Sequence, residues 1–398
     1  MKTFRAIAAL VLVGVLIWLA SPVGAVPIFA RKYGFNCSMC HSNYPRLNDF
    51  GQRYRQNGYQ LPGREGDEKT VLESPPPIAA RTSLGFNVQQ AAGKEQDLNQ
   101  FQLNGLDLLS AGLVYRNIGY MVVYLPPIPA FRGVTDQAGA LEMASVVFSN
   151  VASPWLNVRV GRFEPALVAF SAKRQLTASP YEAYELAFPS GSPLSETQEG
   201  IEVTGHGGGF EFAFGWLNGS ATNRVDDIPS DVYLRIAKVF GQGEGQTAGQ
   251  RIGLFGHFGQ ARPDPTLSDK VRQPLFRGGL DASLNLGDFN LSLQFLLGQD
   301  DRDLWGSRDN ILSYGGFAEL SFLPATDWVV LARYDGLKLP GELDVGSINR
   351  MTAAVRYYIW DNLALHLEYS YRHQNSDLPI DQEALTYHFA TVRLDAAF

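Results

Sequence analysis

Residues 363–372 read LALHLEYSYR, and their alternation decides the fold of most of the chain. Every second residue is leucine or tyrosine, and the residues between them are small, polar or charged. Because successive side chains of a β-strand point to opposite faces, this strand has one apolar and one polar face. An apolar face suits lipid and a polar face suits a water-filled lumen, which indicates a transmembrane β-barrel. A soluble β-sandwich also alternates, so the pattern alone leaves that alternative open.

The same alternation recurs in residues 210–216 and 289–297 and extends, with interruptions, from residue 78 to the last residue, Phe398. It is weakest in residues 106–113, where the apolar and polar positions no longer alternate. Short and long connections alternate from residue 286 onward, as in outer-membrane barrels with short periplasmic turns and longer external loops. We therefore expect residues 78–398 to form an all-β transmembrane barrel of about sixteen antiparallel strands, with both ends in the periplasm. The expected strands are 78–90, 99–115, 117–126, 139–150, 155–164, 198–206, 209–219, 231–241, 249–261, 273–286, 288–300, 311–323, 327–338, 349–360, 362–374 and 384–398.

Residues 1–25 have the pattern of a secretory signal peptide. Lys2 and Arg5 precede an apolar run, and small residues at 23–25 suit a cleavage site. An uncleaved membrane anchor is the alternative, although the run is short for a spanning helix. Export and a lipid-facing barrel together predict a bacterial outer-membrane location.

The segment between the signal peptide and the barrel contains the only two cysteines, in Cys37-Ser38-Met39-Cys40-His41. This spacing is typical of c-type haem attachment, in which both thiols form thioethers with the haem and the adjacent imidazole binds the iron. A small disulfide between Cys37 and Cys40 is the alternative. A zinc site would need more soft ligands than His41 supplies. We expect residues 26–62 to form a small α-helical haem segment with one covalent haem c, followed by a linker over residues 63–77.

The haem segment is expected to contain two helices, one leading into the motif from about Phe29 and one with Pro45 in its first turn. Asn57-Gly58 is a helix stop. Residues 26–64 contain six basic residues and one acid, a formal charge of +5, whereas the 25 basic and 39 acidic residues that follow give −14. Opposite charges favour docking of the two parts, although two solvated surfaces that never meet would look the same.

A sixth ligand for the haem iron is not evident within the segment. Either the barrel supplies it, or an Asn, a Tyr or a water occupies the position, or the site is open. The absence favours a module completed by residues downstream. By strand phase, His257 and His366 face the lumen, so we take these two as distal-ligand candidates. For any single histidine, however, a structural role is the more common one.

The connection over residues 165–197 is the longest between the expected strands. It contains Arg174, Tyr181, Glu182, Tyr184 and Glu185. It either lies outside the barrel as a surface loop or folds into the lumen as a constriction, where its carboxylates would attract a cation.

The runs PIFARKYG over residues 27–34, PRLNDFG over 45–51 and NGY over 57–59, together with the haem motif, resemble the fused monohaem cytochrome–porin family of outer-membrane proteins. Its best-known members are iron oxidases. The resemblance covers about 35 residues closely and the rest only in architecture. It implies Cys37 and Cys40 as haem attachment residues and His41 as axial ligand, and it assigns no distal ligand.

Three functions follow as hypotheses. The first is transfer of electrons from an extracellular donor to a periplasmic electron-carrier cytochrome. With Fe(II) as the donor, the protein would be an iron:cytochrome oxidoreductase. The second is the same conduit delivering electrons to an extracellular acceptor. The third is a diffusion porin in which the haem segment is a structural or redox-sensing plug. Outer-membrane lipid is a partner in all three, no nucleic acid is expected, and no convincing nucleophile–base pair suggests a hydrolase.

Overall fold

A computed structural model describes residues 28–73, 77–91, 98–127, 139–153, 156–185, 194, 196–219, 229–240, 249–261, 273–300, 311–339, 346–375 and 385–398. The expected signal peptide lies outside these residues. Within them, no helix is long and apolar enough to cross a membrane.

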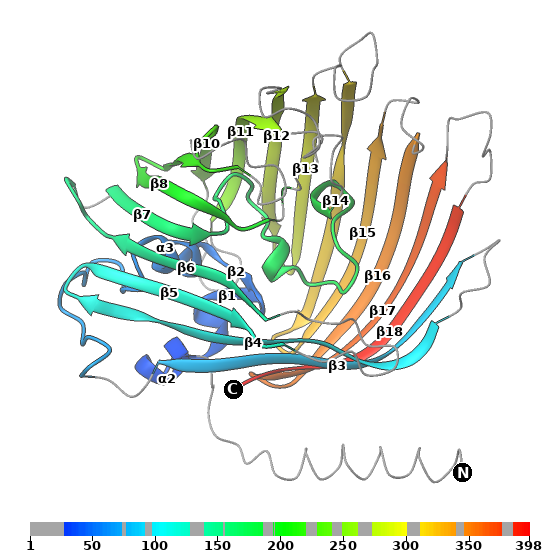
Figure 1. Cartoon of the computed structure of the whole chain (residues 1–398). Coiled ribbons are helices and arrows are strands. Elements are labelled where there is room, and N and C mark those ends of the chain that lie inside the picture. Colours follow the sequence, from blue (N-terminus) through cyan, green and yellow to red (C-terminus); the bar gives the residue numbers. More distant parts are fainter. Residues whose placement is uncertain are drawn as a thin grey trace.

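Sixteen antiparallel strands of the described chain close into one barrel, as expected from the sequence (Figure 1). The barrel closes where the last strand pairs with the first, with Leu394 opposite Leu84. The strands are β3 (Ile78–Ala91), β4 (Leu98–Tyr115), β5 (Ile118–Leu125), β6 (Ala140–Phe148), β7 (Leu156–Phe163), β8 (Gln198–Gly207), β9 (Phe210–Leu217), β10 (Asp231–Phe240), β11 (Gln250–Ala261), β12 (Gln273–Leu286), β13 (Phe289–Asp300), β14 (Ile311–Ala325), β15 (Trp328–Lys338), β16 (Ser347–Trp360), β17 (Leu363–Asn375) and β18 (Leu385–Ala397).

The faces of the barrel are inverted relative to a water-soluble protein. On β17, Leu367 and Tyr369 are 43% and 49% exposed, whereas His366 is fully buried and Glu368 is 5% exposed. A β-sandwich would place the leucine inside and the charged groups outside. The outward apolar face therefore excludes the sandwich and suits a hydrocarbon surrounding.

A register shift lies directly before the residues of weak alternation, 106–113. The ladder between β3 and β4 shifts register between Ser83 and Leu84, opposite a positive-φ glycine, Gly105. A bulge inserts an extra residue on one strand, so the inward and outward phases change there.

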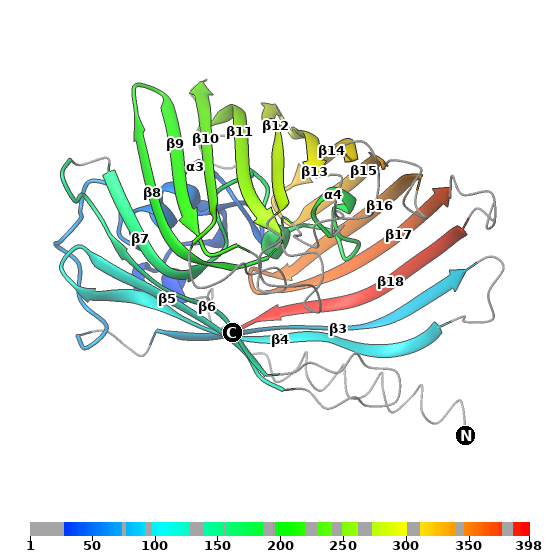
Figure 2. The same cartoon turned by 45° about the horizontal axis from the view of Figure 1, so that its top comes forward.

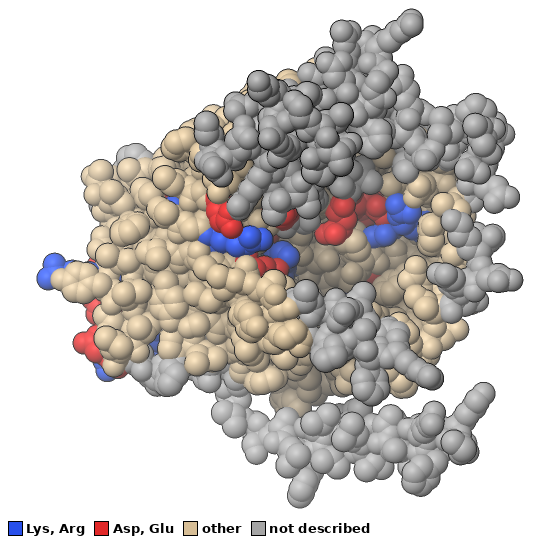
Figure 3. All heavy atoms as spheres, in the orientation of Figure 1, with Lys and Arg blue, Asp and Glu red and all other residues tan. Residues whose placement is uncertain are grey.

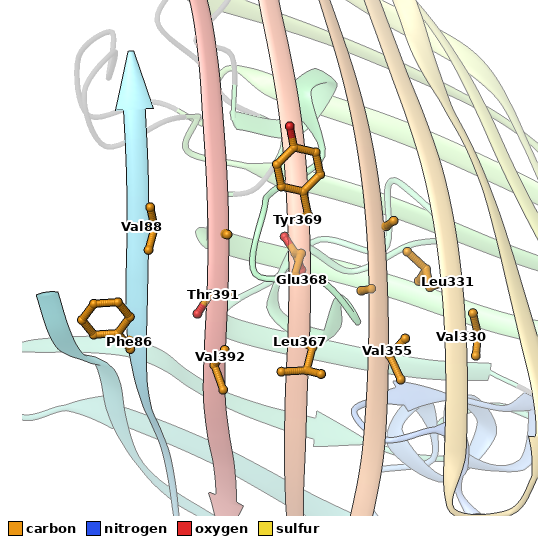
Figure 4. A pocket seen from close by; sticks show the side chains of 13 residues that line it. Phe86, Val88, Val330, Leu331, Val355, Leu367, Glu368, Tyr369, Thr391 and Val392 are labelled. Carbon is orange, nitrogen blue, oxygen red and sulfur yellow. The ribbon is translucent and has the colours of Figure 1, made fainter. Parts of the chain in front are cut away.

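Part of the outer wall forms a shallow apolar groove across β15–β18 and β3 (Figure 4). Val355, Leu367 and Val392 lie in one row of directly paired positions along its lower side. The small side chains of Ala353 and Ala390 line the groove and leave room for it between the larger ones. The groove belongs to the same outward apolar face.

The two ends of the barrel differ. One end, the turn end, holds short turns such as those at Gly287 and Asp361, together with both ends of the barrel sequence, Ile78 and Phe398. From β13 onward, the connections at the opposite end, the loop end, are longer, because residues 301–310, 339–346 and 376–384 join the strands there. This alternation agrees with the expectation from the sequence.

The N-terminal elements lie at the turn end of the barrel, where their side chains bond to inward-facing residues of the wall (Figures 1 and 2). They are α2 (Ile28–Tyr33), the 3-10 helix η1 (Cys37–Met39), the short strands β1 (His41–Asn43) and β2 (Arg46–Leu47), and α3 (Asp49–Gln56). The second helix begins later than expected. Pro45 precedes it, and Asn48 is its N-cap, accepting a hydrogen bond from the Gly51 N–H at 2.9 Å. This cap satisfies a backbone donor at the helix start.

The described first part of the connection after β7, residues 164–185, folds into the lumen, which decides between the two alternatives left by the sequence. Its elements are η2 (Ala172–Arg174) and α4 (Glu182–Glu185). Tyr181 and Tyr184 are each 1% exposed, and the Tyr181 ring stacks on Phe317 of β14 at 4.2 Å between centroids. Arg350 and Arg372 of the wall bind Glu182, so this carboxylate is not free to attract a cation.

Charged side chains line the lumen. Figure 3 shows them gathered in the central hollow of one face, while the surrounding wall is largely uncharged. Many form buried ion pairs within the wall, such as Arg235–Asp281 at 2.7 Å and Arg277–Asp300 at 2.7 Å. Buried charges are tolerated when they are paired and hydrogen-bonded.

The C-terminal end of α3 touches the wall directly. The Gly58 backbone approaches Gly119 of β5 so closely that a Cβ on Gly119 would lie 2.0 Å from the Gly58 carbonyl oxygen. Beside this contact, the Ser149 hydroxyl donates to the Asn57 carbonyl at 2.7 Å. The wall therefore requires glycine here to admit the N-terminal segment.

We expect the Gly119→Ala variant to weaken docking of the segment by about 1–3 kcal/mol, because the added methyl overlaps the Gly58 backbone. Faster hydrogen exchange in α3 than in the unaltered protein would reveal it. Gly207→Ala is the matched control, since a Cβ there meets nothing within 4 Å. Equal exchange rates in both variants would contradict the proposed contact.

Candidate functional site

Cys37, Cys40 and His41 line a single cavity within the N-terminal segment. The cavity has a volume of about 40 Å³. Its other walls come from α2, α3 and the chain between and after them, and they are mostly aromatic or apolar: Phe29, Ala30, Tyr33, Phe35, Asn36, Phe50, Tyr54 and Leu61. The segment therefore surrounds the motif with an apolar site of its own.

The two cysteines are free thiols in the structure and are not joined as a disulfide. The Cys37 thiol lies 3.5 Å from the Asp361 carbonyl in the turn between β16 and β17. Burial raises the pKa of Cys37 to about 12 and the pKa of Cys40 to about 11. Both groups are therefore neutral thiols at physiological pH, and the neutral thiol is not the form that coordinates a metal ion.

His41 is oriented by backbone oxygens. Its Nδ1 lies 3.2 Å from the carbonyl oxygens of both Pro45 and Arg46, so Nδ1–H is the donor and Nε2 is left as the basic nitrogen. Burial lowers the pKa of His41 to about 4, which keeps the ring neutral. A neutral imidazole whose other nitrogen donates to a carbonyl is the usual arrangement of a metal-binding histidine.

These residue types are the ones that a c-type haem site uses. Two thiols and a neutral imidazole lie together at one apolar cavity, and several elements of the N-terminal segment line this cavity. No cluster of three or more His, Cys, Asp or Glu side chains in the described chain forms a separate metal site. The haem itself stays a prediction.

The two distal-ligand candidates lie elsewhere in the lumen. His257 on β11 bonds through Nε2 to Asp231 at 3.0 Å, and His366 on β17 bonds through Nε2 to Glu368 at 2.9 Å. Neither lines the cavity that contains His41. The structure therefore does not bring them to the motif, and each is held by a carboxylate of the wall.

Arg46 links the motif to the barrel, a role that the sequence did not reveal. Its carbonyl accepts from His41, and its guanidinium forms a short ion pair with Glu319 of β14, which is fully buried. The same guanidinium donates to Tyr181 at 3.1 Å and to Ser292 at 3.3 Å. Glu319 has the inward phase of its strand, but its partner is 273 residues away, so no local pattern could identify the pair.

A second set of charges joins the haem segment to the inward-folded connection. Arg55 of α3 and Arg174 of η2 both bind Glu164, at 3.5 and 2.6 Å. At the turn end, Arg251 of β11 binds Asp49 at 3.2 Å. Through these contacts, basic residues of the N-terminal segment bind acidic residues of the barrel and its connection, and one acid of the segment binds a wall arginine.

No protein-family model matches the sequence, and no curated protein matches it. Among solved structures, the barrel is similar to an anion-selective porin from Comamonas acidovorans, with a TM-score of 0.61 and 14% identity over 81% of this chain and 99% of that chain. It is also similar to the outer membrane channel DcaP of Acinetobacter baumannii (TM-score 0.58, 9% identity, 81% and 97% covered) and to OprB of Pseudomonas putida (0.56, 9%, 82% and 95%). At these identities the likeness establishes the fold, a closed sixteen-stranded porin-like barrel.

We expect Glu319→Gln to release the N-terminal segment more readily, because the variant leaves the Arg46 charge without its buried partner. Loss of one partner of a buried pair costs about 3–5 kcal/mol. Hydrogen exchange in α3 should therefore rise by about a hundredfold or more. Asp281→Asn is the matched control, because Asp281 is an equally buried wall carboxylate paired within the barrel. A similar change in both variants would assign the effect to the barrel and not to the docking pair.

Proposed function

We propose that the protein is an outer-membrane electron-transfer protein that carries one covalent haem c inside a porin-like barrel. The outer-membrane location is supported by the outward apolar face and by the expected signal peptide. The observation that carries the proposal is the meeting of Cys37, Cys40 and His41 in one apolar cavity, in a segment docked within the lumen.

In this proposal, different residues of the chain attach the haem, bind its iron and orient the histidine. Cys37 and Cys40 would attach the haem, and His41 Nε2 would bind its iron, which supplies the one-electron chemistry. Pro45 and Arg46 hold the imidazole through its Nδ1. Phe29, Tyr54 and the other cavity rings exclude water from the site.

The position of the segment bears on the electron route. The apolar band of such a barrel is about 25 Å tall, a long gap for transfer to a haem hanging below it. Docking inside the lumen shortens the distance to a donor that enters from the loop end. The turn end then faces the periplasm, where an electron-carrier cytochrome would accept the electron. The resemblance of the haem segment suggests Fe(II) as donor, while the direction of flow depends on the haem potential.

Expression in a host with the haem-attachment machinery tests this function. Outer membranes should contain a covalent haem band that is lost in the Cys37→Ala/Cys40→Ala variant. Fe(II) added from outside should reduce that haem within seconds. A haem that dithionite reduces but Fe(II) does not would remove iron as the donor. Absence of covalent haem in the unaltered protein would remove the electron-transfer function.

A diffusion porin with a haem-bearing plug is the second candidate, and the fold similarity to porins favours it. A polar cavity beside the N-terminal segment, lined by residues such as Asn87, Gln102 and Asp107, adds to that support. On this reading, small hydrophilic solutes would pass between the segment and the wall.

Planar-bilayer recordings separate the two candidates. The electron-transfer function predicts a small conductance that increases when the docking contacts are weakened, as in Glu319→Gln, because the segment narrows the lumen. A large conductance of the unaltered protein, equal to that of the variant, would favour the diffusion porin.

A further inference from the structure

The polar cavity lies between the N-terminal segment, the inward-folded connection and the inner wall of β3, β4, β6, β16 and β18. Its volume is about 580 Å³. Tyr44 and Pro45 form its boundary with the haem segment, and Asn104 of β4 lines the opposite wall. The cavity is thus large enough for a small solute with its hydration shell and is walled mainly by polar groups.

Tyr44 separates this cavity from the axial histidine. The rings of Tyr44 and His41 lie 5.1 Å apart between centroids, with an interplanar angle of 67°. The Tyr358 hydroxyl of β16 donates to the Tyr44 carbonyl at 2.5 Å, which fixes the residue against the wall. Pro45, the next residue, accepts from His41. A solute in contact with Tyr44 is therefore one side chain away from the iron ligand.

The charges of the cavity leave a positive excess. Arg81 pairs with Asp107 at 2.7 Å, and Lys173 of η2 pairs with Glu142 at 2.5 Å. Asp395 is shared by two guanidinium groups. The cations that line the cavity are Arg81, Lys173, Arg356 and Arg393, and the anions are Asp107, Glu142 and Asp395. One cation is therefore in excess, and walls of low dielectric focus its field into the cavity.

We propose that this cavity is the docking site of the electron donor, a small hydrophilic solute with a preference for anions such as carboxylate chelates of a metal ion, and that Tyr44 is its contact with the haem site. The inference rests on the proposed function. One electron leaves the donor, which is oxidised, and reduces the haem iron; the periplasmic carrier then takes it up. Minerals and protein donors are too large for this site.

Access is tested with a single engineered thiol. In the haem-bearing protein Cys37 and Cys40 are blocked as thioethers, so Asn104→Cys provides the only free thiol. Mass spectrometry then measures its labelling by two reagents of similar size, anionic sulfonatoethyl and cationic trimethylammonioethyl methanethiosulfonate. We expect the anionic reagent to label the cysteine at position 104 at least about threefold faster than the cationic reagent does. Asn349→Cys is the control, because position 349 has the outward phase of β16. The two reagents should label this cysteine at similar rates.

The charge preference is tested at Lys173, whose side chain is 33% exposed. Lys173→Glu should reverse the ratio of labelling rates at position 104, because it turns the excess charge negative. The same variant should lower the rate of haem reduction by anionic ascorbate relative to cationic hexaammineruthenium(II). Lys238→Glu, an equal substitution at an exposed position of β10 outside the cavity, should leave both ratios unchanged.

The outcomes separate this inference from the function on which it rests. Labelling at position 104 should slow reduction by both small reductants, while a reduced carrier protein at the turn end still reduces the haem at an unchanged rate. If the label leaves reduction by small donors unchanged, the cavity is not the donor site, although the electron-transfer function stands. If neither small donors nor the carrier protein reduce the haem, the proposed function itself fails.

Discussion

The ion pair between Arg46 and Glu319 connects three parts of the molecule that are distant in sequence. Glu319 belongs to the barrel wall, Arg46 to the haem segment, and Tyr181, which bonds to both, to the connection folded into the lumen. A carboxylate buried to this degree requires a cationic partner, because desolvation without one costs several kcal/mol. Arg333 of β15 lies 3.8 Å from Glu319 within the wall, and Arg46 is the closer cation and comes from the N-terminal segment. The wall therefore specifies where the segment docks, and through the Arg46 carbonyl it also fixes the orientation of His41.

This dependence explains how so short a segment holds an apolar cavity. About 35 residues bury too little surface to be stable alone. Here the segment gains support from wall contacts on several sides, including Arg251 to Asp49, Ser149 to Asn57 and Tyr358 to Tyr44. A covalent haem would add a further internal support. The barrel therefore does more than cross the membrane, because it also completes the fold of the site that it encloses.

The inverted distribution of polarity ties the architecture to the proposed function. An outward face of leucine, valine and aromatic residues requires a hydrocarbon surrounding, so polar and charged groups collect in the lumen. There they meet the basic segment, whose positive charge is balanced by wall and connection carboxylates such as Glu164 and Glu319. The remaining polar cavity beside Tyr44 is the part of the lumen that these contacts leave unfilled. On the proposed function, electron transfer and solute entry would depend on the same lumen.

The sequence by itself determined the elements whose information is local. Period-two alternation identified the strands, and connection lengths identified the two ends. The spacing of Cys37, Cys40 and His41 predicted a haem attachment site, and the structure places these three residues around one cavity. The sequence also left alternatives open: the connection over residues 165–197 was either a loop or a constriction, and His257 and His366 were selected by phase alone. The tertiary structure decided these points, placing the connection inside and both histidines on carboxylates of the wall. The reason is physical, because the phase of a strand gives the face of a residue but not its partner across a closed barrel. Contacts such as Arg46 with Glu319 arise only when residues hundreds of positions apart meet in one lumen.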